Sequence, residues 1–473
     1  MKSKTRQEAA FENKCGKFVI SKRNFDLQYY NFYNARYLKM FDIIKQSALD
    51  KFGQDVKIIK LNQLMEHPGE DVCVTGVLLK VMKQQRSVLR EVSEDLELIP
   101  EEEKEKYIDS KDILSLQDDT EACLLQGGLD IAGHVTGVMI AVLGREDDNG
   151  NRFIVSDYCY PSIAPQLNTI SPPTTEQLVL LISDLGFSVK QDMNVVSARD
   201  YLIDFITGNL DGLTNRGTQI VRVIIAGNSL CHEARDEERE LEALENANED
   251  EWNRKEKAYT VDSLKKVDDF LYQLAKVVPV DLMPGECDPA TIMLPQQPFH
   301  SKMLPKSSPL PGLFRATNPY VATISGRTVI GNCSRVIKSI QEASTFDEPV
   351  DILEATLKWR HLAPTAPDTV FSCPFKGDDP FVIENQPHLY FAGSQSSFNT
   401  KIVTMNNHKT RIVAVPSFKK TRTAIMVNMR NLGCEVVAFN WSEGEVMLRD
   451  DDEPISLTHQ IIQDYTYTFL SVI

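Results

Sequence analysis

Near the start of the chain, large apolar side chains recur with the period of a helix. Five of them are spaced by three or four residues: Tyr30, Tyr33, Tyr37, Phe41 and Ile44. This spacing puts all five on one helix face, and Gly53 provides a stop signal soon after. We therefore predict an amphipathic helix in an N-terminal helical extension over 1–55, with its aromatic face packed against the chain's own body.

From 57 to 160 the apolar runs are short and typical of strands. They are Lys57–Leu64, Val72–Met82, Ala122–Leu129, Gly137–Leu143 and Arg152–Tyr160. The sequence Asp147-Asp148-Asn149-Gly150 predicts a hairpin turn. Five strands at this spacing predict a small closed β-barrel, an OB-fold domain over 56–165. Between the second and third strands, the acidic stretch 90–121 indicates a solvated insertion.

After residue 175, runs typical of strands alternate with runs typical of helices. The expected strands are Gln177–Ser183, Val221–Ala226, Val277–Leu282 and His388–Ala392, and the expected helices are Ala198–Ile206, Val261–Ala275 and Asp351–Arg360. This alternation predicts an α/β layered domain over 176–473, with its functional edge at the C-terminal strand ends. The fold class is therefore α/β plus a β-barrel. Residues 232–256 are interpreted as a second acidic insertion.

The net charge of −16 is concentrated in two places. Residues 90–121 carry −9 and residues 232–256 carry −7, so the rest of the chain is balanced. No cluster of Lys and Arg stands out, and we expect any contact with DNA to be indirect. The nine cysteines show no metal-binding spacing, and the chain has no apolar run long enough for a membrane span or signal peptide.

Glycine-containing loops follow several predicted strands, at the positions where a two-metal phosphoesterase carries its ligands. The loops contain Asp184 and Gly186, Gly227 and Asn228, Gly285, Glu286 and Cys287, and Gly393, Ser394 and Ser396. Two-metal hydrolysis requires carboxylates and imidazoles. At these four motifs only Asp184 clearly keeps a ligand, so we expect a vestigial site with no catalytic residue, metal or cofactor.

Some of these residues, and others nearby, admit further interpretations. Asp184 and Glu286 could form a weak one-metal carboxylate pair, although ordinary hydrogen bonding is the preferred interpretation. His361 and His300 could be catalytic, but neither accompanies a recognisable nucleophile, and structural roles are preferred. An OB barrel can also stack single-stranded DNA on aromatic residues. The candidates for such stacking are Phe153, Tyr158 and Tyr160, which stand on strands bounded by acidic residues.

Several long motifs carry a resemblance to a known family. They include Asp281-Leu-Met-Pro-Gly-Glu-Cys-Asp-Pro289, Leu294-Pro-Gln-Gln-Pro-Phe-His300, Arg360-His-Leu-Ala-Pro-Thr-Ala-Pro-Asp-Thr369 and Pro387-His-Leu-Tyr-Phe-Ala-Gly393. With these motifs the chain resembles the small (B) subunits of replicative DNA polymerases, and among them those of DNA polymerase delta. The likeness covers roughly residues 25–440.

The resemblance implies an OB-fold domain beside a calcineurin-like phosphoesterase domain that no longer cleaves. It also implies a nuclear, non-catalytic regulatory subunit that binds the C-terminal metal-cluster domain of the catalytic subunit and a third subunit. The candidate partner contacts are Leu294, Phe299 and His300, within the proline-rich loop Leu294–Pro305; a second such loop is Pro364–Pro367. The alternatives are a metal-dependent proofreading phosphodiesterase and a single-stranded DNA-binding OB protein.

Overall fold

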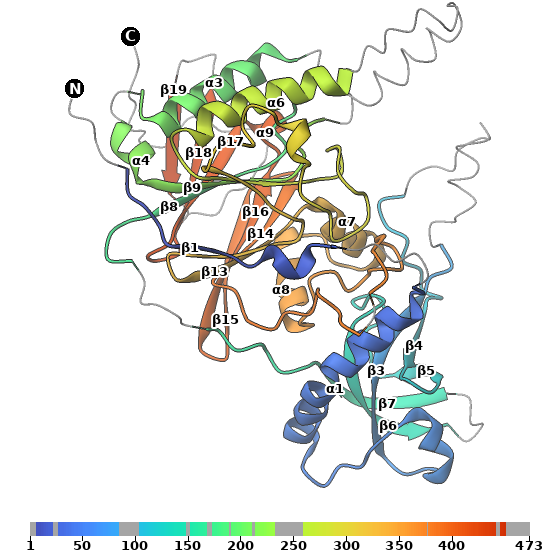
Figure 1. Ribbon diagram of the computed structural model, residues 1–473. Coiled ribbons are helices and arrows are strands. Elements are labelled where there is room, and N and C mark those ends of the chain that lie inside the picture. Colours follow the sequence, from blue (N-terminus) through green and yellow to red (C-terminus); the bar gives the residue numbers. More distant parts are fainter. Residues whose placement is uncertain are drawn as a thin grey trace, which may run out of the picture.

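A computed structural model describes most of the chain. The described residues are 6–21, 27–84, 104–147, 152–167, 173–188, 191–210, 213–231, 259–375, 377–440 and 445–450. They form three β-sheets, arranged as a smaller unit with one sheet and a larger unit with two (Figure 1). Of the predicted acidic insertions, residues 90–103 and 232–256 lie outside the described part.

The smaller unit contains the helix predicted near the start of the chain and most of the strands predicted between residues 57 and 160. Helix α1 (Tyr30–Phe52) ends at Gly53 and packs beside the sheet, as expected (Figure 1). The strands are β2 (Ile58–Ile59), β3 (Val72–Val81), β4 (Ile113–Gln117), β5 (Ala122–Gly127), β6 (Met139–Glu146) and β7 (Arg152–Cys159). Their order is β2-β3-β4-β5-β7-β6, and β6 also pairs with β3. The hydrogen-bonded pairing from β3 to β6 therefore closes on itself.

Two sequence predictions for this unit differ from the structure. The first predicted strand, Lys57–Leu64, is reduced to β2, because the chain turns at Leu61 into the 3₁₀ helix η2 (Leu61–Glu66) and buries Leu61 and Leu64. The acidic stretch 90–121 contains β4, in which Leu114 and Leu116 are fully buried. Alternating apolar residues thus form a strand within a region whose charge suggested a solvated excursion.

The larger unit is a sandwich of two sheets covered by helices on both outer faces (Figure 1). One sheet has the order β11-β10-β9-β8-β17-β18-β19. Its strands are β8 (Leu178–Ile182), β9 (Ile220–Ala226), β10 (Val280–Met283), β11 (Leu313–Arg315), β17 (Thr423–Asn428), β18 (Cys434–Asn440) and β19 (Glu445–Asp450). Helices α3 (Met193–Thr207) and α6 (Tyr259–Ala275) pack on it, and the short α4 (Thr214–Gln219) leads into β9.

The second sheet of the sandwich has the order β1-β12-β13-β14-β16-β15. Its strands are β1 (Phe11–Asn13), β12 (Tyr320–Ile324), β13 (Arg327–Asn332), β14 (Leu389–Gln395), β15 (Asn399–Met405) and β16 (His408–Pro416). Helices α7 (Ser334–Ala343) and α8 (Pro349–Lys358) cover it, and η3 (Ser301–Met303) and α9 (Phe418–Thr421) lie in connections. The mixed α/β architecture expected from the alternating pattern is confirmed.

The predicted N-terminal helical extension is wrong for the first described residues. Residues 6–18 run along the larger unit, where β1 pairs antiparallel with β12 and is followed by the 3₁₀ helix η1 (Cys15–Phe18). The cause is apolar burial, since Cys15 joins the core between the two sheets and Phe18 stacks on Phe381.

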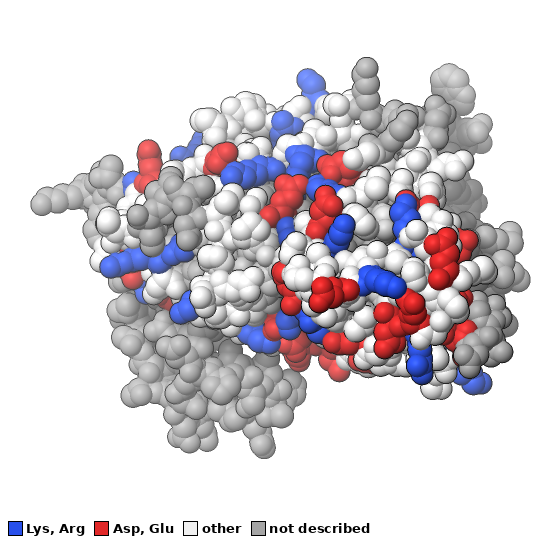
Figure 2. All heavy atoms as spheres, turned by 90° about the horizontal axis from the view of Figure 1, so that it is seen from below, with Lys and Arg blue, Asp and Glu red and all other residues white. Residues whose placement is uncertain are grey.

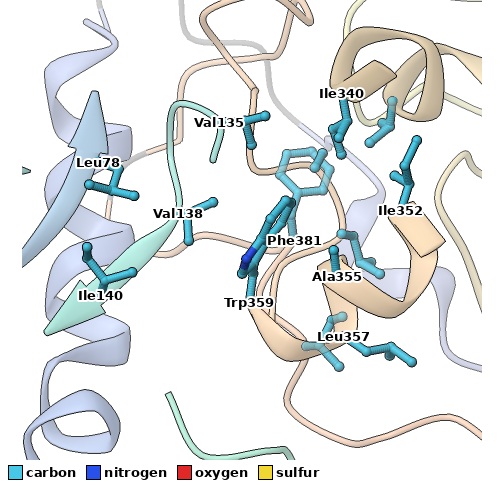
Figure 3. Close-up of a cluster of buried hydrophobic side chains, with 14 of the residues drawn as sticks. Leu78, Val135, Val138, Ile140, Ile340, Ile352, Ala355, Leu357, Trp359 and Phe381 are labelled. Carbon is cyan, nitrogen blue, oxygen red and sulfur yellow. The ribbon is translucent and has the colours of Figure 1, made fainter. Parts of the chain in front are cut away.

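One hydrophobic core joins the two units. Figure 3 shows Leu78, Val138 and Ile140 of the smaller unit on one side, and Ile352 and Leu357 of α8 on the other. Trp359 and Phe381 lie between them. Burial of this shared apolar surface fixes the units against each other. Of the helices in the described residues, none combines the length and apolar character needed to cross a membrane.

Candidate functional site

The predicted loops converge where the two sheets of the sandwich meet. Asp184 follows β8, Asn228 follows β9, and Ser394 lies near the end of β14. The backbone N–H of Asp184 donates to the Gly227 carbonyl at 3.0 Å, and the N–H of Ser394 donates to Ser183 Oγ at 2.6 Å. Asp184, Asn228 and Ser394 all have positive φ angles, of 54°, 55° and 57°. Such strained backbone is typical of functional sites.

Asp184, the one expected ligand, is engaged within the protein. Its Oδ2 accepts a hydrogen bond of 2.5 Å from Ser417 Oγ. Gly186, which we expected at the position of a phosphoesterase histidine ligand, has φ of +67°. A Cβ atom there would lie 2.8 Å from Cβ and Cγ of Lys419. The Lys419 side chain therefore covers the space that an imidazole ligand would need.

Asn228 also forms hydrogen bonds with neighbouring loops. Its Nδ2 donates to Ser394 Oγ at 3.0 Å, and its Oδ1 accepts from the backbone N–H of Cys287 at 3.1 Å. A Cβ on Gly285 would approach Asn228 Oδ1 to 2.2 Å, so the third loop can lie against this amide only through glycine. The side chain thus links three loops instead of facing a cation.

Asp288 holds the third loop from inside the protein. It is buried, and it accepts hydrogen bonds from the backbone N–H groups of Leu230 at 3.0 Å and Gly285 at 2.8 Å. Burial raises the pKa of this carboxyl to about 6. Burial also raises the pKa of the neighbouring Cys287 thiol, which keeps the thiol protonated and unreactive. The motif is therefore a hydrogen-bonded loop anchor.

Glu286 and Ser396 complete the predicted set. Glu286 lines a cleft of about 280 Å³ with Arg335, Lys338 and Glu342. Ser396 is exposed, and the preceding Gln395 side chain turns back to donate to the Gly393 carbonyl at 2.6 Å. Within the described ranges, no three His, Cys, Asp or Glu side chains are grouped so that they could hold a metal.

Three site residues were missed by the sequence analysis: Ser183, Ser417 and Lys419. Ser417 and Lys419 follow β16, which runs parallel to β14 in the same sheet. The apolar run before Ser417 predicts a strand, so strand-end reasoning could have drawn attention to it. Nothing in the sequence indicates that Lys419 lies over Gly186.

The two histidines have contacts of structural histidines. His361 is buried; its Nε2 lies 2.8 Å from Asp379 Oδ2, and its Nδ1 accepts from the N–H of Ala363. Burial lowers the pKa of His361 to about 4. His300 is exposed, and its Nδ1 accepts from the N–H of Lys302 at the start of η3.

Of the candidate partner contacts, only His300 is at the surface. Leu294 is 2% exposed and Phe299 is 1% exposed. Leu294 belongs to the core shared by the two units, whereas Phe299 belongs to the core that also contains Leu271 of α6 and Leu304. In the second proline-rich loop, Ala366 is fully buried. These apolar side chains serve the chain's own cores in this structure.

The comparisons with known proteins cover both units. A family model described as DNA polymerase delta subunit OB-fold domain matches residues 28–158, and a model of the B subunit of DNA polymerase alpha/epsilon matches residues 179–400. DNA polymerase delta subunit 2 of Drosophila melanogaster is 32% identical over 92% of this chain and 98% of its own.

Two further relatives match a similar share of the chain. The DNA polymerase delta small subunit of Arabidopsis thaliana is 32% identical over 92% of this chain and 96% of its own. That of Saccharomyces cerevisiae is 29% identical over 90% and 92%. Because this similarity extends over both units of the chain, the chain belongs to the family of DNA polymerase delta small subunits.

Proposed function

We propose that this chain is a non-catalytic scaffold subunit of DNA polymerase delta, built from an OB-type barrel and an inactive calcineurin-like phosphoesterase domain. The observation that supports loss of catalysis is the state of the converging loops. Asp184 accepts a hydrogen bond from Ser417, and Asn228 is hydrogen-bonded to Ser394 and to the backbone of Cys287. The Lys419 side chain covers Gly186. A single carboxylate in such surroundings cannot hold two divalent ions against water.

The proposed partners are the C-terminal metal-cluster domain of the catalytic subunit and a third polymerase subunit, with the nucleus as the place of action. A scaffold needs a fixed arrangement of its two units, and the shared core around Trp359 and Phe381 supports that requirement. A rigid platform also loses little conformational entropy when a partner binds.

The single-stranded DNA alternative receives little support from the described residues. Phe153 is fully buried, and Tyr158 and Tyr160 pack against each other and against His134. These rings are not open platforms on which bases can stack. On the face drawn in Figure 2, basic and acidic side chains are interspersed. Direct, tight binding of DNA is therefore not part of the proposal.

Two experiments test the proposed function. Purified chain incubated with magnesium, manganese or zinc should not hydrolyse a phosphodiester, and turnover that disappears in Asp184→Ala would overturn the proposal. Co-expression with the C-terminal domain of the catalytic subunit should give a complex with a raised melting temperature, because a partner that binds only the folded state stabilises it. An unchanged melting temperature together with separate elution would count against a scaffold.

A further inference from the structure

Four exposed apolar side chains form a stripe across the outer face of the smaller unit. They are Val81 of β3, Ile113 of β4, Leu124 of β5 and Ile154 of β7, with exposed fractions of 56%, 41%, 40% and 37%. The alternate residues Leu114, Leu125 and Phe153 point into the barrel and belong to the core. Helix α1 packs on outward residues of β3 and β6. The stripe therefore lies outside the area that α1 covers.

The register of the strands makes the stripe continuous. Val81 and Ile113 are direct cross-strand partners. Leu124 lies diagonally opposite Ile113, and Ile154 lies diagonally opposite Leu124. Diagonal neighbours on one face of a sheet are within reach of each other. A continuous apolar surface, unlike a single exposed apolar residue, is typical of an interaction site.

The face around the stripe is basic, although the whole chain is acidic. Arg152 is the cross-strand partner of Leu124, and Arg145 is the partner of Ile154. Both arginines are exposed, and Arg152 donates to the uncharged Oε1 of Gln126 at 3.2 Å. The other outward positions of β4 and β5 carry no carboxylate; they are Ser115, Gln117, Ala122 and Gln126. An occupant of this face should therefore combine apolar side chains with negative charge.

The segment 85–103, which lies outside the described residues, has this combination in its sequence. It carries seven carboxylates and two arginines. Four of its apolar residues recur every three or four positions: Leu89, Val92, Leu96 and Ile99. This spacing is typical of one face of an amphipathic helix. The chain thus contains an occupant whose apolar pattern and charge both suit the face.

The same segment is attached at the edge of the stripe. It leaves the described chain shortly after Val81 and rejoins it before Ile113, and these two residues pair with each other. The described residues that flank it are in contact, since Lys104 Nζ donates to Gln84 Oε1 at 2.9 Å. A tethered segment is present at a high effective concentration, so it docks more readily than a separate molecule of the same chemistry.

We propose that residues 85–103 dock on this outer face, with their apolar residues against the stripe and their carboxylates near Arg145 and Arg152. The inference is independent of the proposed function. Strands β4 and β5 are the second and third of the closed set from β3 to β7, and the outer face of these strands binds oligonucleotides in OB-fold domains. Carboxylates on that face repel the phosphates of a nucleic acid. Another molecule has to displace the segment in order to use this face.

Limited proteolysis of the full-length chain, with a protease that cleaves after glutamate, tests the docking. Cleavage after Glu91 and Glu101 should be slow in the unchanged chain, because proteolysis follows the population in which the segment is undocked. Leu124→Ser removes an apolar contact and should speed this cleavage about fivefold. Ile402→Ser, at a strand residue of the larger unit that is 47% exposed, is the matched control and should not change the rate.

Substitutions in the segment repeat the test without altering the barrel. Leu96 belongs to the apolar face of the pattern, whereas Leu98, two positions later, falls on the opposite side of a helix. Leu96→Ser should therefore speed cleavage as Leu124→Ser does, and Leu98→Ser should not. This comparison is decisive even if Leu124→Ser lowers the melting temperature of the barrel.

Three outcomes would overturn the proposal. Rapid cleavage of the unchanged chain and of every variant would mean that the segment does not dock. Equal acceleration by Leu96→Ser and Leu98→Ser would mean that the apolar face of the pattern is not recognised. Rapid cleavage that slows only after another polymerase subunit is added would assign the barrel face to that subunit.

Carbodiimide cross-linking of Arg152→Lys locates the segment directly. The reagent activates a carboxylate, which then forms an amide bond with an amine in contact, while the carbodiimide takes up the elements of water and leaves as a urea. Mass spectrometry should find position 152 joined to a carboxylate between Glu91 and Glu97 of the same chain, and Leu96→Ser should reduce this product. The Lys57–Glu70 pair, at 2.7 Å, gives a link that should form in every sample. Recovery of that link alone, or of position 152 joined only to a second copy of the chain, would contradict the inference.

Discussion

Arg36 and Asp379 form an ion pair in which neither side chain is exposed to solvent, with Nε and Oδ2 2.8 Å apart. Arg36 belongs to α1, and its guanidinium also donates to the carbonyl oxygens of Gly137, Pro364 and Ala366 at 2.8–2.9 Å. One side chain thus connects the helix, a loop of the smaller unit and two loops of the larger unit. Every charged hydrogen bond of this kind is strengthened by exclusion of water.

The first prediction is that Arg36→Met destabilises the chain strongly. The substitution leaves Asp379 buried without its cation, and breaking a buried pair in this way costs about 3–5 kcal/mol. The matched control is Lys39→Met, one helical turn away, which breaks pairs with the exposed Asp378 and Glu384 and should cost about 1 kcal/mol or less. Urea unfolding measures the free energy of unfolding of both variants. Equal losses of stability would contradict the role of Arg36 in holding the two units together.

The second prediction concerns pH. His361 has a folded pKa of about 4, lowered first by burial and then by Arg36, whereas an unfolded histidine titrates near 6.5. Between these values the unfolded chain binds a proton that the folded chain does not. The contribution of His361 to the free energy of unfolding should therefore fall as pH decreases from about 6.5 to about 4.

Replacing His361 tests this linkage. In His361→Gln the amide can still donate to Asp379, but the proton uptake is gone, so the free energy of unfolding of the unchanged chain should fall relative to that of the variant as pH decreases from 6.5 to 4. Other groups titrate in both proteins, because burial lowers the pKa of His388 to about 4 and raises the pKa of Asp288 to about 6, with opposite effects on stability. His300→Gln, at an exposed position, is the control. A difference in stability between the unchanged chain and His361→Gln that does not vary with pH would rule out this histidine as a contributor.

The sequence predicted those elements whose periodicity is uninterrupted. The helix from Tyr30, the strands β8 and β9, and α6 all lie where apolar spacing indicated them. Strand β4 was missed because acidic neighbours dominate the composition of its surroundings, although Leu114 and Leu116 alternate toward the core. Strand β1 has only three residues, and its place depends on pairing with β12, about 300 residues later, which local pattern cannot indicate.

The sequence could predict which loops meet at the candidate site, but not which side chains contact one another there. Loop glycines after successive strands indicated that Asp184, Asn228 and Gly285 would meet, and the hydrogen bonds confirm that Asn228 links its neighbours. The sequence could not show that Ser417 binds Asp184 or that Lys419 covers Gly186, because these contacts join residues more than 230 positions apart. Leu294 and Phe299 were predicted as partner contacts from the composition of their loop, and composition does not indicate whether an individual side chain is buried.

The third prediction is that a histidine at position 186 does not restore a metal site. Gly186→His would place a side chain at φ of +67° and against the carbon atoms of Lys419. Gly69 has φ of +72° and open space around it, so Gly69→His measures backbone strain alone, about 1–3 kcal/mol. Gly186→His should lower the melting temperature more than this control does.

A second substitution identifies the cause of that difference. Lys419→Ala combined with Gly186→His should recover part of the lost stability, since it removes two of the three crowding carbon atoms. Neither variant should bind zinc in a calorimetric titration, because Asn228 and Ser394 stay bonded to each other. Stoichiometric zinc binding by Gly186→His would show that the loops rearrange more readily than their contacts indicate.

The fourth prediction separates folding from partner contact at Phe299. Its ring is almost fully buried in the core that includes residues of α6, and Phe299→Ala should cost about 3–5 kcal/mol because it leaves a cavity. The control is Phe371→Ala, at a ring that is 47% exposed and should contribute little to stability. Thermal unfolding of the isolated chain gives both values.

Binding to the catalytic subunit is then measured well below the melting temperature, where the folded fraction of Phe299→Ala should bind with unchanged affinity. Weak binding by fully folded Phe299→Ala would instead mean that this ring leaves the core to contact the partner.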